Sequence, residues 1–104
     1  MSDQNTKKET LRKSLEETLG LAEWSILRKH ATRDVIILVD PSLSLLDVGI
    51  AIAMNDETQV QAWIEEKKLG KPSAEQLTTW ETDLNRTFSS LIVQPFVLMQ
   101  ILNS

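Results

Sequence analysis

The stretch Leu91 to Leu102, LIVQPFVLMQIL, is the most apolar twelve-residue window of the chain, and no charged residue follows Arg86. Such a run is a candidate for a membrane anchor, for part of a core, or for a surface that binds a partner. A membrane-spanning helix needs about 20 mainly apolar residues, whereas Gln94, Pro95 and Gln100 interrupt this run. We therefore exclude a membrane span and expect extended chain.

Pro95 divides the stretch, because proline cannot donate a hydrogen bond to a sheet ladder. We predict one strand over residues 90–94 and a second over residues 96–101. A short helix over residues 96–102, with Pro95 in its first turn, is the alternative.

Alternate residues of an extended chain point to opposite faces of a sheet. Gln94 and Gln100 fall on one face of the extended stretch, and this is the face on which we expect a partner to bind. The interface candidates are Gln94, Phe96, Leu98 and Gln100.

Five branched apolar residues, VIILV at 35–39, indicate a strand that is buried on both faces. We expect it to pair with the strand at 90–94. Asp40 and Pro41 then make a turn. Asp40 is a ligand-binding candidate, because α/β proteins often place ligand-binding groups at the carboxyl ends of strands. The alternative is an aspartate that only caps its own turn.

Capping signals mark the remaining elements as helices. Ser or Thr followed by Glu or Gln three residues later opens a helix, as at Thr6 and Ser73, while Asp56 is also a cap residue. The predicted helices are residues 6–19, 24–31, 45–54, 56–68 and 73–85. Residues 45–54 also fit strand alternation, although their alanines and the start signal at Ser44 favour a helix.

These elements predict an α+β protein in which a small sheet of two or three strands is covered by four or five helices. A chain of 104 residues is expected to form one domain over residues 1–104. Residues 1–5 are polar, and we expect them to be a disordered tail.

Composition limits the partners. The net charge is −4, which makes nucleic acid an unexpected partner because duplex binding requires a basic face. There is no cysteine, and the N-terminus lacks the apolar segment of a signal peptide. We therefore expect a cytoplasmic protein.

The residues that carry chemistry are few. His30 is the one histidine, and it lies beside Arg28 and Lys29, where a surface position is expected. No spaced acidic motif predicts a metal site, and three glycines do not make a phosphate-binding loop. We predict no cofactor and no metal, and we do not favour an enzyme.

Several phrases of the chain resemble a short bacterial family catalogued only as a domain of unknown function (family 2288). The resemblance covers residues 18–100 and rests on Trp24, VIILVDPSLSLLDV, GIAIAMNDETQVQAWI, KPSAEQLTTW and LIVQPFVLMQ. It implies no activity and no catalytic residues. The chain departs from the pattern at Glu23 and Ile26, where the family implies a Ser and Glu cap for the second helix.

Two functions remain. The first is a non-catalytic interaction or accessory module that binds another protein chain or a second copy of itself, because the apolar segments exceed what the helices can cover. The second is a small-ligand-binding or enzymatic domain with a site near the carboxyl end of the strand at 35–39.

Overall fold

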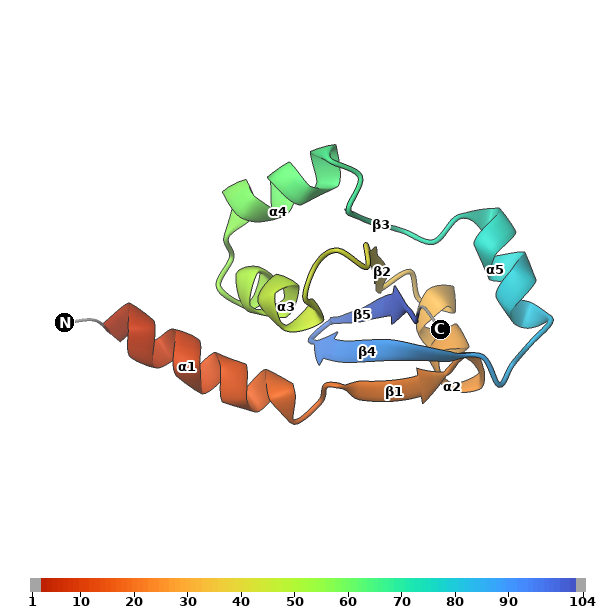
Figure 1. Ribbon diagram of the computed structural model, residues 1–104, viewed down its shortest axis with the longest axis horizontal. Coiled ribbons are helices and arrows are strands. Elements are labelled where there is room, and N and C mark those ends of the chain that lie inside the picture. Colours follow the sequence, from red (N-terminus) through yellow and green to blue (C-terminus); the bar gives the residue numbers. More distant parts are fainter. Residues whose placement is uncertain (1–2, 103–104) are drawn as a thin grey trace.

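The computed structural model describes residues 3–102, which form one mixed sheet with helices on both of its faces (Figure 1). The helices are α1 (Asp3–Glu16), α2 (Trp24–Thr32), α3 (Leu45–Ala53), α4 (Glu57–Glu65) and α5 (Ala74–Glu81). The strands are β1 (Gly20–Glu23), β2 (Ile36–Val39), β3 (Leu69–Gly70), β4 (Thr87–Val93) and β5 (Phe96–Ile101). Their order across the sheet is β1-β4-β5-β2-β3.

The sheet has five strands, so the prediction of two or three strands is wrong, although the α+β class holds. The missed strands are the two at the edges of the sheet, β1 with four residues and β3 with two. Segments this short carry no alternating pattern of their own. They are extended because the edges of β4 and β2 offer them backbone hydrogen bonds, with Gly20 opposite Ser90 and Gly70 opposite Leu38.

The pairing of the central strands also differs from the prediction. The strand before Gln94 pairs with β1 and β5, and β2 pairs instead with β5, in parallel. The chain reverses at Gln94 and Pro95, so that Val93 lies opposite Phe96. In one continuous strand, residues 91 and 98 would point to opposite faces of the sheet. Because the chain turns back over two residues, they pair with each other and point to the same face. The predicted face that carried both glutamines therefore does not exist.

Each face of the sheet has its own core. On one face, α1 and α3 cover a cluster of buried residues that includes Leu15, Val39, Val48, Leu91, Val93 and Leu98. On the other face, α2 and α5 cover a cluster that includes Trp24, Ile36, Trp80, Phe88, Val97 and Met99. Ile36 and Val39 belong to different clusters. This explains why the segment at 35–39 is apolar throughout, as expected for a strand that is buried on both faces.

Three aromatic rings fill the core beneath α2 and α5. The centroid of the Trp80 ring lies 5.1 Å from that of Trp24 and 4.9 Å from that of Phe88. Trp24 Nε1 donates a hydrogen bond of 2.6 Å to Glu81, so the buried indole is satisfied. No side chain caps α2, but its Trp24 N–H donates to the Arg86 carbonyl at 2.8 Å. A neighbouring backbone thus replaces the cap that the family pattern implied.

The helices lie close to their predicted positions, and the segment predicted at 45–54 is helical over Leu45–Ala53 rather than extended. Ser44, Asp56 and Ser73 cap α3, α4 and α5 as expected. The first helix differs, because α1 begins at Asp3 and ends at Glu16. The predicted tail at 1–5 therefore overlaps α1, while its residues 1 and 2 lie outside the described part of the chain.

Gly49 allows α3 to lie close to the sheet. A Cβ atom at this position would be 2.5 Å from Leu91 Cδ2 and 3.2 Å from Val93 Cγ2. Both neighbours are buried in the core, where side chains are closely packed, so an added methyl group forces them or the helix to shift.

Gly49→Ala should therefore lower the free energy of unfolding by about 1 kcal/mol or more, because overpacking outweighs the gain in helix propensity. Gly20→Ala is the control, since a Cβ there meets nothing within 4 Å. Urea unfolding of both variants measures the difference. Equal stability of Gly49→Ala and wild type would show that the helix can move away from the sheet.

Candidate functional site

Helix α4 is poorly packed for an amphipathic helix. Its apolar side chains include Val60, Trp63 and Ile64, yet none of its residues is buried. Ile64 keeps 47% of its surface exposed. A helix of nine residues is marginal in isolation and depends on packing of its apolar face. The apolar face of α4 is therefore a surface that the fold leaves incompletely covered.

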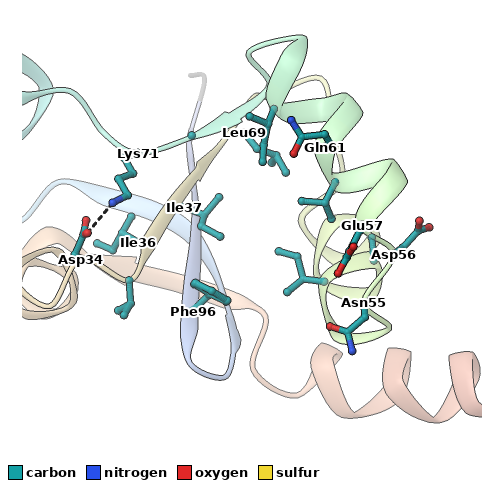
Figure 2. Close-up of a pocket in the computed structure, with 16 residues that line it drawn as sticks. Asp34, Ile36, Ile37, Asn55, Asp56, Glu57, Gln61, Leu69, Lys71 and Phe96 are labelled. Atoms are coloured by element: carbon teal, nitrogen blue, oxygen red, sulfur yellow. Dashed lines mark hydrogen bonds and ion pairs between the residues drawn. The ribbon is translucent and has the colours of Figure 1, made fainter.

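A cavity of about 530 Å³ lies between α4, the end of α3 and the region of the sheet around β2 (Figure 2). Its apolar lining consists of Val35, Ile36, Ile37, Ala51, Ile52, Val60, Ile64, Leu69 and Phe96. Binding sites for small molecules are typically concave, mainly apolar and about 300–1,000 Å³ in volume. The cavity has the size and the lining of such a site.

Polar groups stand around the mouth of the cavity. On the sheet side, Lys71 Nζ lies 2.6 Å from Asp34 Oδ2. On the helix side, Figure 2 shows Asn55, Glu57 and Gln61 at or near the cavity. Figure 2 shows these two sets of polar groups on opposite sides of the cavity, with Ile37 and Phe96 between them. A ligand with an apolar body in the cavity can therefore place a polar end beside either set.

Asp40, the ligand-binding candidate from the sequence, does not line this cavity. It lies at the carboxyl end of β2, and its Oδ2 accepts a 2.9 Å hydrogen bond from the Ser42 N–H. Hydrogen bonds from Ser42 lower the pKa of the Asp40 carboxyl, and nearby Lys68 adds to the effect. The carboxylate therefore caps its own turn, and the expectation that Asp40 binds a ligand stays a prediction.

The four interface candidates occupy different surroundings. Gln94 is exposed in the turn, and Phe96 is half-buried in the wall of the cavity. Leu98 has 0% of its surface exposed, so it offers nothing to a partner. Gln100 Nε2 donates to the carbonyl oxygens of Asp40 at 2.9 Å and Leu43 at 2.7 Å. These contacts give Gln100 a structural role between β5 and the β2–α3 loop.

Sequence reasoning did not locate the cavity, although one signal pointed toward it. The sequence predicts a helix over residues 56–68 and more apolar surface than the helices can cover. Which helix remains uncovered depends on how the chain packs. Phe96 is the one sequence candidate that lies in the cavity wall.

Two further findings concern residues 3–102. No cluster of three or more potential metal-ligating side chains occurs among them. None of the helices in this range combines the length and the apolar character needed to cross a membrane.

Comparisons with known proteins identify relatives by sequence and by fold. The model of a family described as "Protein of unknown function (DUF2288)" matches residues 10–101. The NMR solution structure of PA1075 from Pseudomonas aeruginosa superposes with a TM-score of 0.76 and 22% sequence identity, covering 100% of this chain and 93% of that one. This likeness shows the fold alone. The search of curated proteins gave no significant match.

Gln100→Ala should destabilise the protein by roughly 1–3 kcal/mol, because it removes the donor to two loop carbonyls. Gln94→Ala is the matched control and should be close to neutral, since Gln94 is exposed in a turn. Urea unfolding compares the two variants. Similar losses in both would argue against the structural role of Gln100.

Proposed function

Because the chain belongs to the family described as "Protein of unknown function (DUF2288)", we infer a function from its own geometry. We propose a non-catalytic binding module whose cavity beneath α4 takes the apolar part of a small ligand. The single observation that carries this proposal is the incompletely covered apolar face of α4, which borders a cavity of about 530 Å³.

Burial of apolar surface drives such binding, at about 25 cal/mol for each Å² removed from water. Ile64 is 47% exposed, and Val60, Ile52 and Phe96 are half-buried around the same space. A ligand that fills the cavity would complete the packing of α4 against the sheet. We therefore expect the ligand to stabilise the fold as well as to bind.

We propose binding rather than catalysis because the single histidine lies outside the cavity lining. General acid–base catalysis needs a positioned proton donor or acceptor at the reacting group, most often a histidine. His30 lies in α2 and is not part of this lining. The site also differs from the one expected near Asp40, because residues 34–37 line the cavity at the amino-terminal half of β2.

Octanol, as a neutral apolar probe, should raise the melting temperature of the protein. A ligand at 100 times its Kd stabilises by about 2.7 kcal/mol. Ile64→Gln should weaken binding by roughly 1 kcal/mol, about fivefold, because it removes apolar contact in the cavity. Glu65→Gln, on the same helix but outside the lining, should bind as wild type does. An unchanged melting temperature at saturating octanol would contradict the proposal.

The open edge of β1 favours a second function, in which this edge pairs with a second copy of the chain. Strand β1 is the outermost strand and is paired on its β4 side, and its Leu21 is 70% exposed. An edge strand that presents both unpaired backbone groups and an apolar side chain is a template for pairing with another chain. Antiparallel pairing of β1 with its counterpart would make one continuous sheet.

Sedimentation at micromolar concentrations should then detect a dimer, and Leu21→Lys should shift it toward monomer, since charge on an edge strand opposes pairing. Ile26→Lys is the control, because Ile26 is 55% exposed but belongs to α2. A wild-type protein that stays monomeric throughout the concentration range would rule out the β1 dimer.

A further inference from the structure

The charged residues that line the cavity indicate which charge the polar end of the ligand carries. Building on the proposed function, we infer that the ligand is an amine, with its apolar body in the cavity and its cationic group beside Glu57. The inference rests on charge complementarity between this opening and its occupant.

The charged residues that line the cavity are predominantly acidic. They are the carboxylates of Asp34, Asp56 and Glu57 and the ammonium group of Lys71. Asp34 and Lys71 form an ion pair and the Asp56 side chain is directed away from the cavity, so Glu57 supplies the unbalanced negative charge. The potential at the opening therefore attracts cations and opposes anions.

Among residues 3–102, the cation that lines the cavity is Lys71, and it is already engaged. Lys71 Nζ lies 2.6 Å from the carboxylate of Asp34. An anionic ligand that reached Lys71 would have to compete with this ion pair, and it would also meet the repulsion of Asp34. A carboxylate is thus a poor match for the sheet side of the mouth.

Glu57 is the carboxylate best placed to meet a ligand. Figure 2 shows its side chain on the cavity side of α4, whereas the Asp56 side chain is directed away. Asp56 Oδ1 accepts the 3.2 Å hydrogen bond from Gln59 N–H that caps the helix. Within residues 3–102, Glu57 forms no ion pair. Glu57 is exposed, so its carboxylate is accessible to the amine of a ligand.

Three probes of equal chain length separate charge from apolar binding: octylamine, octanol and octanoate, with Kd values measured by calorimetry. We expect octylamine to bind about two- to fivefold more tightly than octanol, the range for a solvent-exposed ion pair. Octanoate should bind more weakly than octanol. Added salt should reduce the preference for the amine and leave octanol binding nearly unchanged.

Glu57→Gln should abolish the preference for octylamine while octanol still binds. Glu65→Gln is the matched control, because it removes a carboxylate from the same helix outside the cavity and should keep the preference. The salt dependence of wild type tests the same point without a variant.

Equal binding of all three probes, or tighter binding of octanoate, would overturn the amine inference and leave the apolar cavity as a binding site. A preference for the amine that survives in Glu57→Gln would overturn the role of Glu57. Failure of every probe to bind would overturn both the proposed function and the amine inference.

Discussion

The reversal of the chain at Gln94 and Pro95 is the constraint on which the rest of the structure depends. It folds β5 back between β4 and β2, so that β5 becomes the central strand of the sheet. Leu98 and Met99, which are adjacent on β5, then point into the two separate cores, and both are fully buried. One apolar segment thereby supplies side chains to both faces, which explains why it contains no charge.

Because the sheet has a core on each face, helices must pack on both faces. The two faces are not covered equally well. The aromatic core receives α2 and α5, and its rings contact one another closely. The opposite core receives α1 and α3, and the missing side chain of Gly49 lets α3 approach Leu91. Helix α4 packs Val60 and Trp63 against this core only partly, and its apolar face also borders the cavity. The candidate site therefore exists because α4 packs less closely against the sheet than the other helices do.

Two of the polar residues that the sequence marks as site candidates, Asp40 and Gln100, form hydrogen bonds that hold the loop after β2. The turn after β2 exposes backbone groups that must find partners. Asp40 satisfies the Ser42 N–H, and Gln100 satisfies the carbonyls of Asp40 and Leu43. By contrast, Glu57 stands at the cavity without an ion-pair partner in the described part of the chain. A side chain that is already hydrogen-bonded in this way is less free to meet a ligand than one that is not.

The sequence by itself determined the features that depend on neighbouring residues. Helix starts at Ser44, Asp56 and Ser73 follow from hydrogen bonds that span three residues, and the apolar run at 35–39 marks a strand with two buried faces. The tertiary structure decided the number of strands, their partners and the side of the sheet to which each residue points. Strands β1 and β3 exist only because distant edges pair with them. The cavity likewise depends on where α4 packs relative to the sheet, and contacts between segments far apart in the chain leave no local pattern in the sequence.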